Sequence, residues 1–142
     1  MTNEAGSVQA VSTNRHTPPI GKYSPAVKVS LGNGMDMVFV SGQVASDAEG
    51  VTICPGDASG QAKAVFANIA ALVTAAGGNL GHIVSVVIYL TDMADFAAVS
   101  AVRNSLLKDP PPASTLVEVS RLAIADHLVE ISAVAIVPGR AE

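Results

Sequence analysis

The chain of 142 residues is long enough for one ordinary domain and too short for two. With 49% hydrophobic and only 14% charged residues it is too apolar for a disordered protein, and its mean hydropathy of +0.44 is high for a monomer in water. No apolar run approaches the ~18–20 residues of a membrane span, and the net charge of −4 with scattered Lys and Arg argues against a nucleic-acid partner. The remaining explanation is a surface buried between copies of the chain, which predicts a homo-oligomer.

The N-terminal part of the chain predicts a lead-in followed by a hairpin. Residues 1–17 are polar and without periodicity, so they predict a flexible segment before a single domain at residues 18–142. Two apolar runs follow at residues 26–31 and 35–40. The Gly-Asn-Gly sequence between them, residues 32–34, tolerates positive φ and predicts the turn of a β-hairpin.

The strongest helical pattern begins near Ser59, after which apolar residues recur at the spacing of one helical face through residue 76. Ser59 or Asp57 is the expected N-cap, and the glycine pair at residues 77–78 supplies a left-handed C-terminal stop. Asn68 is expected on the solvated side of this helix.

The second half of the chain predicts one more helix and three more strands. Residues 83–90 are β-branched and nearly all apolar, as in a strand buried on both faces. Residues 91–93 are expected to cap a second helix that ends at Asp109 and the prolines after it, and strands are expected at residues 115–119 and 128–137. The order ββαβαββ predicts an α+β fold with two helices on one face of a mixed sheet. The other face has no covering layer in the sequence, so we expect other subunits to cover it.

The sequence offers no pattern for a metal or a bound cofactor. Cys54 is the single cysteine, so no disulfide forms within the chain, and the three histidines lack the close spacing of metal ligands. No glycine-rich phosphate loop or nucleophile elbow is present. The acidic Glu4 and the lack of an apolar segment near it argue against a secretory signal. We therefore expect a cytoplasmic protein without metal or cofactor.

Glu130 is the only charged residue of the last predicted strand, and a carboxylate there loses hydration unless it is paired or close to water. It is either a structural hydrogen-bonding residue at the rim of the sheet or a general acid or base beside a small cleft, with a raised pKa. Tyr23, in a loop before the first apolar run, either caps such a pocket or packs against the fold. These residues alone name no function.

Several stretches of the chain, in the right order, resemble the signatures of the RidA/YjgF family, also called the endoribonuclease L-PSP or RutC-like family. Each stretch is a weak signal by itself, but together they are specific and cover about residues 18–137. They are IGKYSPAV at residues 20–27, VFVSGQ at 38–43, the long helix at 61–77, VIYLTDMADF at 87–96, and the segments at 112–122 and 129–135.

The resemblance implies a chorismate-mutase-like fold that assembles as a homotrimer with a barrel-like core and a cleft between neighbouring subunits. Many members hydrolyse reactive enamines and imines, such as 2-aminoacrylate, to a keto acid and ammonia. The family's Glu that positions or activates water falls on Glu130 of this chain. The Tyr of the cleft falls on Tyr23, and the backbone contacts fall on Ser41 and Gly42.

Three positions depart from the family pattern. Ser114 replaces the Arg that grips the substrate carboxylate, Ala94 replaces an Asn, and Leu116 replaces a Cys or Thr. A serine hydroxyl cannot neutralise a carboxylate, so we expect weak activity on 2-imino acids and a neutral or more apolar ligand. Lys22 and Arg103 are the candidates for a replacement cation.

Two functions remain open from the sequence. One is a trimeric, deaminase-like hydrolase that uses Glu130 and water on a small metabolite. The other is a non-catalytic member of the same family that binds a metabolite or regulates through it. An inserted residue near positions 123–126 alters the loop before Glu130. Both functions predict a small-molecule partner.

Overall fold

The computed structural model describes residues 4–15 and 19–139. Parts of the expected N-terminal segment and of the expected domain, residues 1–3, 16–18 and 140–142, lie outside the described residues. The described chain folds into β1 (Val8–Val11), β2 (Ala26–Gly32), β3 (Met35–Val44), α1 (Ala58–Ala75), the 3-10 helix η1 (Leu80–His82), β4 (Ile83–Leu90), the 3-10 helix η2 (Met93–Asp95), α2 (Phe96–Leu106), β5 (Ala113–Glu118) and β6 (Val129–Pro138).

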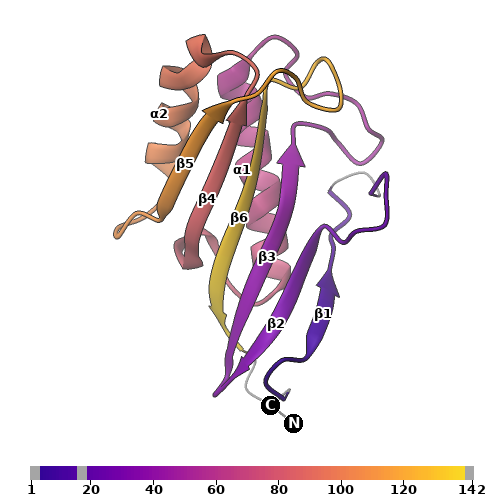
Figure 1. The fold of residues 1–142 in the computed structure, drawn as a ribbon, viewed down its shortest axis with the longest axis vertical. Coiled ribbons are helices and arrows are strands. Elements are labelled where there is room, and N and C mark those ends of the chain that lie inside the picture. The colour runs from indigo at the N-terminus through magenta and orange to yellow at the C-terminus, as the bar shows by residue number, and fades with distance from the viewer. Residues whose placement is uncertain (1–3, 16–18, 140–142) are drawn as a thin grey trace.

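The strands form one mixed sheet in the order β1-β2-β3-β6-β4-β5, and both α-helices lie on one face of it (Figure 1). Neighbouring strands are antiparallel except β4 and β5, which are parallel and are joined through α2. The predicted α+β fold with two helices on one face of a mixed sheet is confirmed.

The β2–β3 hairpin forms where the sequence predicted it. Its turn contains Asn33 and Gly34, with φ values of 55° and 74°. Both values lie in the left-handed region, which Asn and Gly adopt at little steric cost.

Helix α1 supplies much of the core by packing its apolar stripe against β3 and β6. Asp57 is its N-cap, and the Asp57 carboxylate accepts a hydrogen bond of 3.0 Å from the backbone N–H of Gly60. Gly77, with a φ of 104°, follows its end as predicted. The buried apolar side chains of the helix are Ala58, Ala62, Val65, Phe66, Ile69, Leu72 and Val73.

The expectation that Asn68 faces solvent is wrong, because only 3% of its surface is exposed. Asn68 lies three residues after Val65 and four before Leu72, so it shares the apolar face of α1. Its amide donates a hydrogen bond of 3.4 Å to the carbonyl oxygen of Val44. A buried polar group requires such a partner, and this one ties α1 to the end of β3.

Two other segments differ from expectation. Val8–Val11 forms an edge strand within the expected flexible lead-in, because pairing with β2 stabilises it although three of its four residues are exposed. The second helix begins at Phe96 and not directly after its expected cap at residues 91–93. Asp92 instead caps the separate turn η2, by accepting a hydrogen bond of 2.9 Å from the N–H of Ala94.

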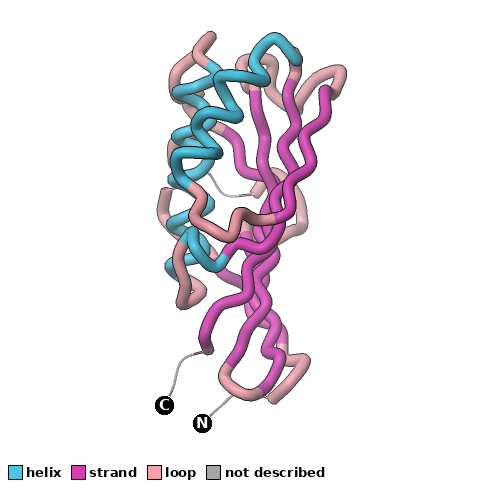
Figure 2. The backbone as a smooth tube through the Cα atoms, turned by 90° about the vertical axis from the view of Figure 1, so that its left-hand side faces the viewer, coloured by secondary structure: helices cyan, strands magenta, loops and turns pink. Residues whose placement is uncertain are grey.

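The sheet face away from the helices carries exposed apolar side chains. Met35, Phe39 and Val117 point to this face and keep 41%, 44% and 39% of their surface exposed. Figure 2 shows that the helices lie only on the other side of the sheet in the described chain. Exposed apolar patches often mark interaction surfaces. Coverage of this sheet face by other subunits stays a prediction. No helix among the described residues is long and apolar enough to cross a membrane.

Candidate functional site

A β-bulge interrupts β3 near its C-terminal end. The register with β6 breaks between Val40 and Gln43, so two β3 residues, Ser41 and Gly42, lie opposite one residue of β6. Bulges bend a strand, redirect its side chains and are frequent beside functional sites. This bulge lies at the end of the sheet where β3 ends and β6 begins, at the top of Figure 1.

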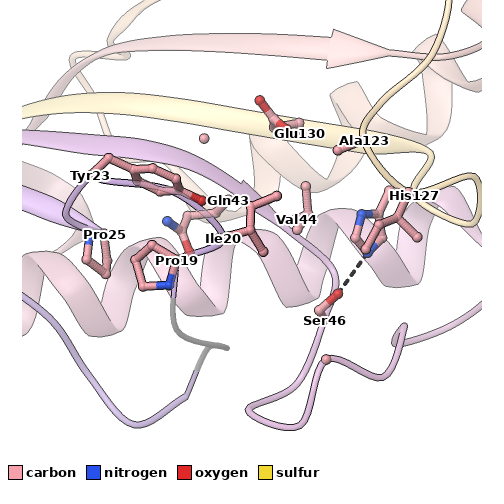
Figure 3. A pocket seen from close by; sticks show the side chains of 13 residues that line it. Pro19, Ile20, Tyr23, Pro25, Gln43, Val44, Ser46, Ala123, His127 and Glu130 are labelled. Atoms are coloured by element: carbon pink, nitrogen blue, oxygen red, sulfur yellow. Dashed lines mark hydrogen bonds between the residues drawn. The ribbon is translucent and has the colours of Figure 1, made fainter.

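Ser41 fastens the loop that carries Tyr23 to this bulge. The Ser41 hydroxyl donates a hydrogen bond of 2.7 Å to the carbonyl oxygen of Ser24, and its backbone N–H donates one of 2.9 Å to that of Pro25. The loop before β2 is thus held at two points against β3. Tyr23 consequently lies beside the bulge, with its phenol toward the centre of the cavity in Figure 3.

A cavity of about 270 Å³ lies between this loop, the end of β3 and the start of β6. Its volume is near the lower limit for small-molecule sites. Polar side chains enter it at separate places in an otherwise apolar wall. They belong to Tyr23, Gln43, Ser46, His127 and Glu130 (Figure 3).

Glu130, the second residue of β6, lines the cavity with its carboxylate directly over Gly42. A Cβ at position 42 would overlap the carboxylate oxygen Oε2, so only glycine leaves room for this arrangement. In the described chain the Glu130 carboxylate has no hydrogen-bond or ion-pair partner. Burial raises the pKa of the Glu130 carboxyl, as its place in the strand predicted.

His127 and Ser46 form a buried pair in the cavity wall. The Ser46 hydroxyl lies 2.8 Å from Nε2 of His127, and the two residues are only 6% and 2% exposed. Burial lowers the pKa of the His127 imidazole, and the neighbouring carboxylate of Asp126 raises it by a smaller amount. The imidazole is therefore neutral at pH 7.

Gln61 of α1 holds the loop that places His127. It is fully buried; its amide nitrogen donates a hydrogen bond of 2.9 Å to the carbonyl oxygen of Asp126, and its amide oxygen accepts one of 2.8 Å from the N–H of Leu128. His127 lies between these two anchored residues. The segment with the expected insertion is thus connected to the main helix.

Ser46, Gln61 and His127 were not predicted as site residues from the sequence. Gln61 lies four residues before Val65, so an amide on the apolar stripe of the helix was the signal that could have indicated a structural role. No such signal marks Ser46 and His127, which are far apart in the sequence and meet only because β3 and β6 pair.

Ala94, Ser114 and Leu116 do not line the cavity. Ser114 pairs with Val86 of β4, whose side chain faces the helices, whereas Glu130 pairs with Tyr89, which faces the other way. Paired residues point to the same side of a sheet, so Ser114 and Glu130 point to opposite sides. Within one chain, the candidate residues therefore form two separate groups.

Arg103 of α2 lies beside Ser114. Its guanidinium nitrogen donates a hydrogen bond of 3.1 Å to the Ser114 hydroxyl, and no carboxylate in the described part of the chain pairs with it. A cation is thus present next to the position where the family resemblance expects an arginine. Lys22 is exposed and does not line the cavity.

No group of three or more His, Cys, Asp or Glu side chains that could hold a metal ion occurs among the described residues. The side chains that line the cavity supply a carboxyl group with a raised pKa, a phenol, an amide and a serine–histidine pair.

Comparison with known proteins identifies relatives of the whole domain. Residues 13–137 match the family described as Endoribonuclease L-PSP. A RutC family protein of Pyrococcus abyssi is 40% identical over 89% of this chain and 95% of its own length. The 2-iminobutanoate/2-iminopropanoate deaminase of Mus musculus is 30% identical over 90% of both chains.

Solved structures of similar proteins share the fold. RidA from a Psychrobacter species is 34% identical, with a TM-score of 0.77 over 89% of this chain and 98% of that one. Escherichia coli TdcF with bound serine is 32% identical, with a TM-score of 0.76 over 94% of this chain and 99% of that one. The chain therefore belongs to the RidA/YjgF family, also called the endoribonuclease L-PSP family.

Proposed function

We propose that this protein hydrolyses small enamines or imines, with Glu130 as the acid and base and water as the nucleophile. The observation that carries the proposal is the half-buried Glu130 carboxyl, which faces the cavity over Gly42, has no partner in the part of the chain that the structure describes, and has a raised pKa. A carboxyl group with a pKa closer to neutrality exchanges protons more effectively at pH 7. The mouse relative, named an imine deaminase, supports this chemistry.

In this proposal the Glu130 carboxylate takes a proton from water as the water oxygen bonds to the carbon of a protonated imine. The resulting carbinolamine receives that proton on its amino nitrogen. The carbon–nitrogen bond then breaks, its electron pair leaves with ammonia, and Glu130 takes the hydroxyl proton as the ketone forms. Glu130 finally returns this proton to ammonia or to solvent. An enamine enters the same sequence after protonation on carbon.

The proposal places each substrate in a cleft between two subunits of a homotrimer. Glu130 and Ser114 point to opposite sides of the sheet in one chain, so a ligand that touches both groups needs the second from a neighbour. The exposed apolar face with Met35, Phe39 and Val117 supports such an assembly. A cytoplasmic location belongs to the same proposal, and the single cysteine, Cys54, is consistent with it.

Arg103 of the neighbouring subunit would bind the substrate carboxylate in place of the arginine that Ser114 replaces. Its guanidinium is free of carboxylates in the described chain and is oriented by Ser114 at 3.1 Å. Guanidinium groups bind carboxylates through paired, charge-assisted hydrogen bonds. TdcF, which has a similar fold, was solved with bound serine, a small molecule with a carboxylate.

The experiment compares imine hydrolysis by the unmodified protein, Glu130→Gln and a matched control, Glu118→Gln. An amino-acid oxidase generates the imines in situ, and keto-acid release is measured above the enzyme-free rate. Removing the acid and base at Glu130 should lower the rate by about 10²-fold or more. Glu118 is exposed and accepts a hydrogen bond from the N–H of Met93, which Gln preserves, so its variant should keep the parental rate.

Parental activity in Glu130→Gln would contradict the proposed role. An unmodified protein that binds small ketones but hydrolyses no imine above the enzyme-free rate would instead indicate the non-catalytic, metabolite-binding function.

A further inference from the structure

The end of the cavity away from the Tyr23 loop is formed by Ser46 and His127 (Figure 3). We propose that this pair is a ligand subsite that donates one hydrogen bond to a neutral acceptor, such as a carbonyl oxygen, at the end of an apolar arm of the ligand. The inference names the substrate class of the same cavity, and it rests on the proposed function for the identification of that cavity as the substrate site.

The side chains of Ser46 and His127 have one hydrogen-bond donor more than the bond between them uses. Ser46 Oγ and His127 Nε2 bond to each other at 2.8 Å, and neither side chain has another hydrogen-bond partner in the described chain. If Ser46 donates its hydrogen to Nε2, the proton of the neutral ring is on Nδ1 and lacks an acceptor. If Nε2 donates to Ser46, the serine hydrogen lacks one. Both tautomers therefore present a single donor.

The unused donor faces the cavity. Both residues line it, and neither contributes an unpaired polar atom that is completely buried within the protein. Figure 3 shows that the ring nitrogen of His127 not bonded to Ser46 points toward the interior, on the side of Val44. A ligand acceptor placed there would satisfy a donor that otherwise depends on water.

The charges near Ser46 and His127 favour a neutral ligand acceptor over a ligand carboxylate. The lowered pKa of His127 keeps the imidazole uncharged at pH 7, so it offers no counter-charge. The charged groups nearest in the sequence and in the cavity, Asp126 and Glu130, are both acidic. A ligand carboxylate would lose hydration here without an opposite charge to compensate.

The residues around the serine–histidine pair indicate the size and polarity of the ligand's apolar arm. Ile20, Val44 and Ile124 provide apolar surface in the cavity wall, and Figure 3 shows Ile20 and Val44 between Tyr23 and the serine–histidine pair. The volume of about 270 Å³ accommodates only a short chain. The substrate class is therefore a small imine whose short apolar side chain ends in a carbonyl or similar neutral acceptor.

The test uses heptane-2,6-dione and 6-methylheptan-2-one, which have the same number of heavy atoms. Both carry the ketone that imine hydrolysis would produce, and they differ only in whether the far end is a carbonyl or a branched alkyl group. Neither contains a carboxylate, so the result does not depend on Arg103. Binding to the full-length protein is measured by NMR titration, with the ring nitrogen signals of His127 observed directly.

The dione should bind at least about fivefold more tightly, since the alkyl end leaves a desolvated donor unpaired. It should also shift the His127 ring signals, whereas 6-methylheptan-2-one should leave them nearly unchanged. In the double variant Ser46→Ala with His127→Leu this preference should disappear. Replacing both partners leaves no unpaired polar group behind, so the fold should survive.

Ser100→Ala is the matched control, because it removes a buried serine hydroxyl of α2, which does not line the cavity. Its ketone preference should equal that of the unmodified protein. Equal affinity for the two ketones, no binding of either, or unchanged His127 signals at saturation with the dione would overturn the inference. Ketone binding is measured without turnover. If the unmodified protein hydrolyses no imine, the proposed function is refuted, but the measured preference for the dione still stands.

Discussion

The cavity at the β3–β6 end of the sheet and the β5–α2 edge are two halves of a candidate site with opposite character. The cavity contributes Tyr23, Gly42 and Glu130, with an acidic group that has no hydrogen-bond or ion-pair partner among the described residues. The edge contributes Arg103 and Ser114, with a cation that has no carboxylate in the described chain. Strand register directs the two halves to opposite sides of one sheet. One subunit therefore keeps Glu130 and Arg103 apart, whereas two neighbouring subunits can bring them to the same ligand.

The two halves also differ in how they are held in place. Hydrogen bonds from Ser41 and Gln61 fasten both loops of the cavity to β3 and α1. At the edge, Arg103 is oriented by side-chain bonds to Ser114 and Asn104 on a half-exposed surface. We therefore expect substitutions in the cavity to affect chemistry and those at the edge to affect substrate binding.

The largest effect is expected from Gly42→Ala. The added Cβ would overlap the Glu130 carboxylate, which must move. Misplacement of a reacting group by about 1 Å costs on the order of 10²-fold in rate, so kcat for imine hydrolysis should fall by about that factor. Gly21→Ala is the control, since its Cβ would meet nothing closer than 3.7 Å. An unchanged kcat in Gly42→Ala would show that the position of Glu130 is not critical.

Arg103→Ala tests the other half. Loss of a charge-assisted pair should raise KM for imines that carry a carboxylate by about 10-fold or more, with a smaller change in kcat. Neutral imines should be unaffected, and Arg103→Lys should restore only part of the loss because it lacks the planar fork. Steady-state kinetics with both substrate types measures this, and equal effects on both types would contradict it.

Gln61→Leu should lower the free energy of unfolding by about 1–3 kcal/mol, because it leaves the carbonyl of Asp126 and the N–H of Leu128 without partners at a part-buried place. Urea unfolding measures the free energy. His127 should also become more mobile, which NMR of its ring can detect. A stability equal to that of the unmodified protein would show that water replaces the Gln61 amide without cost.

The smallest effect concerns stability and pH. The raised pKa of Glu130 means that the folded state binds its proton more tightly than the unfolded state does. Its contribution to stability is therefore present below the ordinary pKa of about 4.5 and is lost as the pH rises through the folded-state pKa. Glu130→Gln should consequently be slightly more stable than the unmodified protein at pH 8, with the difference shrinking below pH 4.5. Urea unfolding at several pH values tests the sign.

The fold was predictable because its signals are local. The Gly-Asn-Gly turn, the cap at Asp57 and the stop at Gly77 each specify a backbone conformation within a few residues. β1 was not predicted, because its four residues are mostly exposed and form a strand only through pairing with β2. Asn68 was misplaced because polarity was taken as a sign of exposure, whereas its hydrogen bond to Val44 permits burial.

The candidate site was predictable only in part. Glu130 was predictable as the single charged residue of an apolar strand. Gly42 leaves room for the Glu130 carboxylate, because a Cβ at this position would overlap it. Ser46 and His127 could not be found from the sequence, since their contact depends on the pairing of β3 with β6. Arg103 was a candidate cation, but its distance to Ser114 depends on how α2 packs beside β5.

The most direct test of a site shared between subunits is the activity of mixed oligomers of Glu130→Gln and Arg103→Ala chains. The two variants are co-expressed with different tags, and species that contain both are purified and assayed with an imine that carries a carboxylate. At substrate concentrations below the native KM, Glu130→Gln alone should be nearly inactive and Arg103→Ala alone should retain about a tenth of the native activity. A mixed cleft can combine Glu130 from one subunit with Arg103 from its neighbour. In a trimer that contains both chains, one of the three clefts combines the two native residues, so about a third of the native activity should return. Mixed species no more active than either variant alone would contradict the account.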